Sequence, residues 1–266
     1  MALSVGRDFL RKEDYMTFSK LITQFENFFK AMGQPNFYNK VLEGLANTVL
    51  IAVLGLLIGV VIGTLIAVVK VSPKYKLIMR ILDKICDIYI AIFRGTPMMA
   101  QLLVAYYLLF PMMKIQVSGF VIGFVVFGMN SGAYVAEIMR GGLNSVDRGQ
   151  MEAGRALGLS YATTMIKIVV PQAFKNIVPT LGNEFITLIK ETSVLSFISI
   201  MDLYSSIRIT AQPSYAYAAA YLFMSLVYIT LVLIITVIIK VVERAFSASD
   251  RNRTGSKSKK GVKKNA

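Results

Sequence analysis

The 266-residue sequence contains no histidine and a single cysteine, Cys86. Histidine is the commonest metal ligand and general base in proteins, so its absence argues against a metal centre or an acid–base active site. One cysteine cannot form an intrachain disulfide, so cysteine usage does not indicate the redox compartment. The sequence also lacks a G-x-x-x-x-G-K-[ST] phosphate-binding loop. We therefore expect no cofactor in this chain, and any ATP hydrolysis on which it depends must occur on another polypeptide.

Apolar residues are abundant instead, at 55% of the chain, with a mean hydropathy of +0.60. Three runs contain no charged residue: 48–69, 115–136 and 209–239. A helix needs about 20 apolar residues to cross a hydrocarbon core of about 30 Å, so each run is long enough. Three such helices buried in a small soluble protein would leave too little surface to dissolve it. The sequence therefore predicts an all-α integral membrane protein.

Two further spans are expected from weaker signals. One lies in the charge-free stretch 95–113, and the other lies between Gln172 and Ile189, where Glu184 interrupts the apolar pattern. The chain is then expected to cross the membrane about five times within a transmembrane domain of residues 44–245. In the first span, small residues recur every four positions and so line one helix face, which predicts close helix packing; they are Gly55, Gly59 and Gly63.

The two ends of the chain differ from this domain. Residues 1–43 form an N-terminal extension in which four apolar residues are expected to share one helical face: Leu21, Phe25, Phe28 and Phe29. The extension is therefore either an interfacial helix or a disordered leader. Residues 246–266 are rich in lysine, arginine, serine, glycine and asparagine, which predicts a disordered basic tail. The tail either attracts anionic membrane lipid or stays solvated.

The basic residues also predict the orientation of the chain. Five spans place the termini on opposite sides, and cytoplasmic segments carry the excess of lysine and arginine. With the C-terminus inside, segments 70–84, 140–175 and 240–266 are cytoplasmic and hold 19 basic residues, against 9 on the outer side. We therefore expect an outer N-terminus and a cytoplasmic C-terminus. In so apolar a chain, the net charge of +14 favours a membrane surface over nucleic acid as the anionic partner.

The polar segment between the third and fourth expected spans has the pattern of two short helices. Asp147 with Gln150 three residues later resembles a capping box that begins a helix, and Gly158 can adopt the positive φ that ends it. Ser160 can cap a second helix, which Pro171 closes or bends. A short rigid helix on the cytoplasmic face suits docking into a groove of a partner protein.

This segment, residues 147–171, resembles the EAA loop of ABC importer permeases, whose pattern is E-A-A, three residues, G, nine residues and I-x-L-P. Here Glu152-Ala153-Gly154 is followed by Gly158 and then by Ile168-Val169-Val170-Pro171, at the family spacing. Gly154 and Val170 depart from the pattern, conservatively in size. The stretches 93–97, 132–142 and 181–186 resemble the polar amino acid branch of these permeases, the glutamine, glutamate, arginine and histidine type.

The resemblance implies a permease of the type I importer fold in a bacterial plasma membrane. It implies two ABC ATPase subunits that carry the ATP, a second permease subunit of the same or a homologous chain, and an extracytoplasmic amino-acid-binding protein. It also assigns ATPase coupling to the loop, where we name Glu152, Ala153 and Gly158 as the coupling residues.

Polar residues within the expected spans are candidates for substrate binding, because such groups are costly in a membrane. These are Asn47 at the mouth of the first span, Asn130 in the third and Glu184 in the fourth; the resemblance places substrate contacts near Asn47 and Glu184. Glu184 can receive the ammonium group of an amino acid, or it can be a structural partner of Arg94 or Lys190. Thr96 is a fourth candidate, although the turn of residues 94–97 is also expected to kink a helix.

Two other classes of protein stay open on the residues alone. An ion-coupled secondary transporter is usually built from internal repeats, but no repeat is visible and five spans do not divide into two inverted halves. A membrane enzyme would need a nucleophile motif or a metal cluster, and the sequence offers neither.

Overall fold

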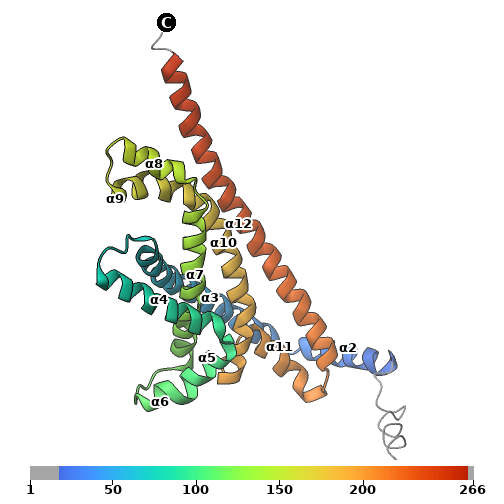
Figure 1. Ribbon diagram of the computed structural model, residues 1–266. Coiled ribbons are helices and arrows are strands. Elements are labelled where there is room, and N and C mark those ends of the chain that lie inside the picture. The colour runs from blue at the N-terminus through green and yellow to red at the C-terminus, as the bar shows by residue number, and fades with distance from the viewer. Residues whose placement is uncertain (1–17, 263–266) are drawn as a thin grey trace, which may run out of the picture.

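The structure is a computed structural model that describes the backbone of residues 18–262 and the side chains of residues 18–244. Within this range it is helical and contains no strand (Figure 1). The longer helices are α2 (Phe18–Met32), α3 (Phe37–Val71), α4 (Leu77–Gly95), α7 (Gly119–Asn144), α10 (Val170–Glu191) and α12 (Tyr217–Val262). The shorter ones are α5 (Met98–Val104), α6 (Phe110–Met112), α8 (Arg148–Ala156), α9 (Tyr161–Thr164) and α11 (Leu203–Ala211). The π-helical segments η1 (Ala105–Leu109) and η2 (Met165–Val169) and the 3₁₀ segments η3 (Thr192–Ile198) and η4 (Gln212–Ser214) link them.

Helices α3 and α7 pack closely at the centre of the bundle. A Cβ atom added to any of five glycines in this pair would lie 2.5–3.0 Å from the facing helix. For four of the five this is closer than a real Cβ approaches, and for Gly55, at 3.0 Å, it is a tight contact. The contacts are Gly55 with Phe127, Gly59 with Ser131, Gly63 with Val135, Gly128 with Ile58 and Gly132 with Ile62. The predicted glycine face is thus confirmed. Because the contacts advance in the same direction along both helices, α3 and α7 are parallel.

Three helices of the described chain are long and apolar enough to cross a membrane: Phe37–Val71, Gly119–Asn144 and Tyr217–Arg244. A fourth span exists if α4 and the segment Met98–Met112 are one span bent by 105°. The break lies at Thr96–Pro97, where a kink was expected. Residues 70–84 were expected to form a basic loop leading into a helix, whereas α4 already begins at Leu77 and forms the first arm of this bent pair. The acidic and basic residues of α4 lower its mean hydropathy, so a hydropathy profile does not identify it as part of a span.

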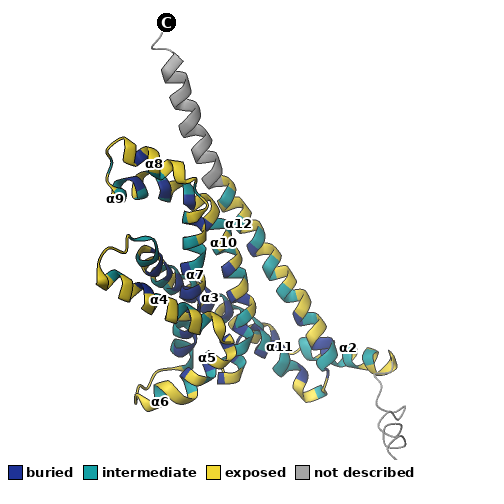
Figure 2. Cartoon of the chain, viewed as in Figure 1, coloured by how far each residue is buried: buried dark blue, intermediate teal, exposed yellow. Residues whose placement is uncertain are grey.

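The fourth expected span, which corresponds to α10, does not meet the same criterion of length and composition. It is nevertheless a long helix that packs against α3, α7 and α12, and Lys175 and Glu184 interrupt its apolar residues. Large apolar side chains face outward along α12 and α4 (Figure 2), among them Leu226, Leu233 and Ile85. This is the surface that a helix presents to lipid.

The two ends of the described chain contain α2 and the end of α12. Residues 18–32 form the helix α2, and the interfacial position of this part of the N-terminal extension stays a prediction. Residues 1–17 lie outside the described residues. At the other end, α12 continues as a helix to Val262, where a disordered tail from residue 246 was expected. No proline interrupts this stretch, and extending an existing helix avoids the cost of nucleation.

The glycine contacts predict a difference between two matched substitutions in the bundle. Gly63→Ala places a Cβ 2.6 Å from Val135, whereas a Cβ at Gly141 meets nothing within 4 Å. Overpacking should cost Gly63→Ala about 1–3 kcal/mol, whereas Gly141→Ala should gain up to about 1 kcal/mol from helix propensity. Thermal unfolding of the purified variants in detergent measures both. Equal melting temperatures for the two variants would contradict this account of the α3–α7 packing.

Candidate translocation path and coupling loop

Glu184 lies at the place where α3, α7 and α10 meet. It is 9% exposed and accepts a hydrogen bond of 3.0 Å from the Ser131 hydroxyl on α7. Gly59 of α3 makes this possible, because a Cβ there would lie 2.7 Å from Ser131. The Arg94 guanidinium is instead 3.6 Å from Glu137, and no ion pair forms at Glu184 within the described residues. A buried carboxylate with a single hydrogen bond keeps most of its capacity to accept others.

Asn130 and Thr96 meet through a residue that the sequence analysis missed, Gln101. The Asn130 amide donates to Gln101 Oε1 at 2.9 Å, and the Gln101 amide donates to Thr96 Oγ1 at 2.9 Å. Both amides also donate to the Phe93 carbonyl, at 3.2 and 2.8 Å. Phe93 lies four residues before Pro97. Because proline has no N–H, it cannot donate to this carbonyl, and the helix ends. The network therefore satisfies backbone groups at the break, beside a mostly apolar cavity of about 310 Å³.

Asn47 is separate from both groups. Its amide donates to the Met201 carbonyl at 2.8 Å, and the neighbouring Thr48 hydroxyl accepts from the Leu203 N–H at 3.1 Å. These bonds fix α3 to the start of α11, which Asp202 caps. The four predicted substrate-binding residues thus occupy three places. The sequence signals for the missed residues are weak: Ser131 follows Asn130, and Gln101 is the only amide in the run 95–113.

The coupling loop has the predicted helix–glycine–helix form. Asp147 Oδ1 accepts from the Gly149 N–H at 2.6 Å and caps α8, Gly158 has φ +79° after it, and Ser160 caps α9. Two details differ from the prediction. The Gln150 side chain accepts from Gln172 at 3.2 Å rather than completing a capping box, and Pro171 lies in the first turn of α10, where its missing N–H needs no helical partner.

The motif residues of the coupling loop differ in exposure. Glu152, Ala153 and Gly158 are exposed, and the neighbouring Leu157 is 80% exposed. Gly154 is buried instead, and a Cβ there would lie 2.4 Å from Thr164 Cγ2 of α9. The departure from alanine at this position is therefore explained by the threonine opposite. The exposed side of α8 also includes Arg148 and Arg155, so it presents charges of both signs. It lies beyond the end of the bundle (Figures 1 and 2).

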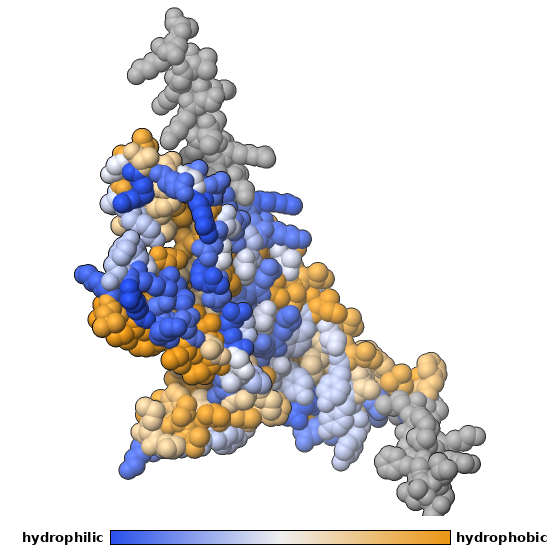
Figure 3. Space-filling model, viewed as in Figure 1, coloured by the Kyte–Doolittle hydropathy of each residue, from blue (hydrophilic) through white to orange (hydrophobic). Residues whose placement is uncertain are grey.

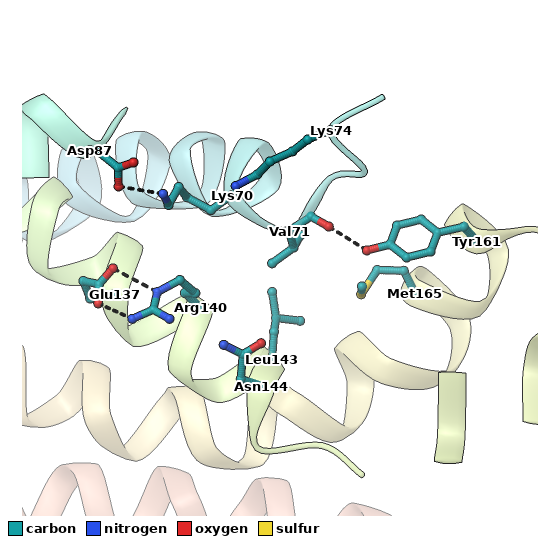
Figure 4. A pocket seen from close by; sticks show the side chains of 10 residues that line it. All are labelled: Lys70, Val71, Lys74, Asp87, Glu137, Arg140, Leu143, Asn144, Tyr161 and Met165. Carbon is teal, nitrogen blue, oxygen red and sulfur yellow. Dashed lines mark hydrogen bonds and ion pairs between the residues drawn. The ribbon is translucent and has the colours of Figure 1, made fainter. Parts of the chain in front are cut away.

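A polar cleft of about 500 Å³ separates the coupling loop from the near ends of α3, α4 and α7 (Figure 4). The Tyr161 hydroxyl crosses it and donates to the Val71 carbonyl at 2.7 Å. Burial raises the pKa of Tyr161, so the hydroxyl stays protonated as a donor. On the walls, Lys70 pairs with Asp87 at 2.7 Å. Glu137 pairs there with Arg140 at 2.6 Å.

Comparison with known proteins decides the family. Residues 55–248 match the model of the binding-protein-dependent transport system inner membrane component. The chain belongs to this family. It is 39% identical over 210 residues to the arginine transport system permease protein ArtQ of Bacillus subtilis, covering 79% of this chain and 94% of that protein. It is 33% identical to the L-cystine transport system permease protein TcyB of the same organism, covering 64% and 70%.

A solved structure described as an amino acid ABC transporter with histidines matches this inner membrane component with a TM-score of 0.71. The two are 35% identical, and the match covers 79% of this chain and 95% of that chain. The resemblance to ABC importer permeases and the all-α fold are both confirmed. Membership of this family argues against the two alternative classes of protein, an ion-coupled secondary transporter and a membrane enzyme.

The Gly154–Thr164 contact predicts a compensating pair in the coupling loop of this permease. Gly154→Ala restores the family pattern but should destabilise the loop by about 1–3 kcal/mol, because its Cβ clashes with Thr164. Thr164→Ala alone should cost about 1 kcal/mol through the lost hydrogen bond to the Ser160 carbonyl. Hydrogen exchange of residues 148–164 measures the loop stability.

The double variant should be more stable than the sum of the two single effects, since the clash is absent from it. Additive losses would show that the loop relaxes around Gly154→Ala without meeting Thr164.

Proposed function

We propose that this permease imports an amino acid as part of an ATP-driven complex in the bacterial plasma membrane. The complex contains two permease subunits, two ATPase subunits on which ATP is hydrolysed, and an extracytoplasmic binding protein. One observation carries the proposal: the exposed side of α8, with Glu152 and Leu157, lies beyond one end of a bundle that contains an unpaired buried carboxylate, Glu184. A docking surface and a polar group in the membrane are what such a permease needs.

The relatives support an amino acid as the substrate. The names of two similar permeases specify arginine and L-cystine, and the similar solved structure is described as an amino acid transporter. These substrates share an α-ammonium and an α-carboxylate group. A carboxylate that makes one hydrogen bond can accept others from an ammonium group, so we assign the ammonium contact to Glu184.

The other substrate-binding candidates act differently in this proposal. Asn130 and Thr96 shape the cavity of about 310 Å³ beside the helix break through Gln101. Asn47 holds the outer end of α3 to the Met201 carbonyl. Asn130 and Thr96 use their side-chain donors on protein groups, and Asn47 uses one of its two N–H groups on Met201. In this proposal these residues position the path, whereas Glu184 contacts the substrate.

In the coupling step, the ATPase binds the exposed side of α8. When the two ATPase subunits close, the loop moves with them. Rigid-body switching of a two-state bundle then exposes the path to one side or the other. The loop faces the cytoplasm, which places the N-terminus outside and the C-terminus inside. Uptake into proteoliposomes that requires ATP, the ATPase and the binding protein tests the whole proposal. Uptake driven by an ion gradient without ATP would refute it.

Gly158 offers a test of coupling that leaves the spans unchanged. At φ +79° a valine is strained by at least about 1–2 kcal/mol, whereas asparagine adopts this conformation readily. We expect Gly158→Val to lose co-purification with the ATPase and ATP-dependent uptake, and Gly158→Asn to keep both. Normal co-purification and uptake for the valine variant would show that the turn does not set the docking geometry.

Glu184→Gln removes a charge from the path but keeps an oxygen that can accept from Ser131. A hydrogen bond to a charged group is worth about 1.5–3 kcal/mol, so uptake at low substrate should fall by about tenfold or more. Ser131→Ala is the matched control, because it removes the hydrogen bond and keeps the charge. Equal uptake by Glu184→Gln and the wild type, at equal protein levels, would reduce Glu184 to a structural role.

A further inference from the structure

Helix α2 lies across the end of α12 that is farthest from the coupling loop (Figure 1). Phe28, which is 1% exposed, attaches it to the bundle, with ring centroids 6.5 Å from Phe37 and 5.6 Å from Phe223. One flank of α2 is apolar and exposed, and consists of Phe18, Ile22 and Phe29. This helix lies outside residues 55–248, the part of the chain that the family model matches.

The other flank of α2 borders a polar cavity of about 360 Å³. Its walls come from α2, the turn of residues 33–36, the start of α3 and η4, and its polar lining includes Asn27, Lys30, Gln34, Asn36, Lys40 and Ser214. The lining contains two lysines and no acidic residue. Neither lysine forms an ion pair with any other described residue. The cavity is therefore a concentration of unpaired positive charge and amide donors.

The two flanks of α2 indicate which medium each one faces. Seen down the helix axis at about 100° per residue, Phe18, Ile22 and Phe29 lie within about 40° of one another. Asn27 lies about 140–180° from these three residues, and Lys30 lies about 80–120° from them, on the polar side between them and Asn27. An interfacial helix turns its apolar flank to lipid and its polar flank to water. The cavity thus opens to the aqueous phase. The surface below α11 is hydrophilic as well (Figure 3).

We propose that this cavity is a docking site for acidic side chains of the extracytoplasmic binding protein. The inference rests on the proposed function, which places this end of the bundle outside the cell. Lysine ammonium groups and amide N–H groups are donors that a carboxylate accepts, and complementary charge on two surfaces speeds their association. Anionic lipid is the other source of negative charge at this surface, but the cavity lies on the flank of α2 that faces away from the lipid.

The test uses the full-length permease with its ATPase in phosphatidylcholine nanodiscs, titrated with the binding protein. The double variant Lys30→Glu/Lys40→Glu should raise the concentration that gives half-maximal stimulation of ATP hydrolysis about tenfold, with the maximal rate unchanged. The difference should shrink at high salt, because exposed charges are screened. Lys20→Glu is the matched control, since Lys20 is an exposed lysine of the same helix that does not line the cavity.

An unchanged titration for the double variant, or an equal shift for Lys20→Glu, would overturn the site. A shift that appears only when phosphatidylglycerol is added to the nanodiscs would assign the cavity to lipid headgroups and also overturn it. A wild-type complex that the binding protein does not stimulate would overturn the proposed function, and the docking site with it.

Discussion

The structure depends on close approach of two backbones inside a membrane. Lipid tails are as apolar as leucine, so helices in a bilayer associate through packing rather than through a hydrophobic driving force. Glycines on both α3 and α7 let these helices touch along five positions. That contact makes the two helices parallel, and so α4, α5 and α6 must carry the chain back between them. It also brings Ser131 into reach of Glu184, which creates the polar point at the centre of the bundle.

The buried polar side chains of this bundle differ in how much of their hydrogen-bonding capacity is used. The amides of Asn130 and Gln101 are saturated, because the helix break before Pro97 leaves carbonyl groups that they satisfy. Glu184 is not saturated, since a single hydroxyl donates to it. Buried polar groups are normally paired. Glu184 is paired with Ser131 but can accept further hydrogen bonds, and this spare capacity is why we propose it as the substrate contact.

The sequence predicted the features that depend on local rules. The four-residue repeat of Gly55, Gly59 and Gly63 indicated a packed face, and Gly158 indicated a left-handed turn, because helical periodicity and positive φ are properties of neighbouring residues. It could not assign partners to Asn47, Asn130 or Thr96, since the partners come from distant segments. It also placed the start of α4 too late and did not predict it as part of a span, because charges such as Asp83 and Lys84 lower the hydropathy of a helix that nevertheless has an apolar face.

Helix α3 is continuous for 35 residues, and both of its ends are attached to other elements. At one end, Tyr161 of the loop that we propose as the ATPase contact donates to the Val71 carbonyl. At the other end, Phe37 packs on Phe28 beneath the basic cavity. A continuous helix moves as a rigid body, so a displacement along its axis at one end is reproduced at the other. In the proposed complex, binding at the outer end of α3 and docking at its inner end are then coupled. By reciprocity, each changes the affinity of the other by the same factor.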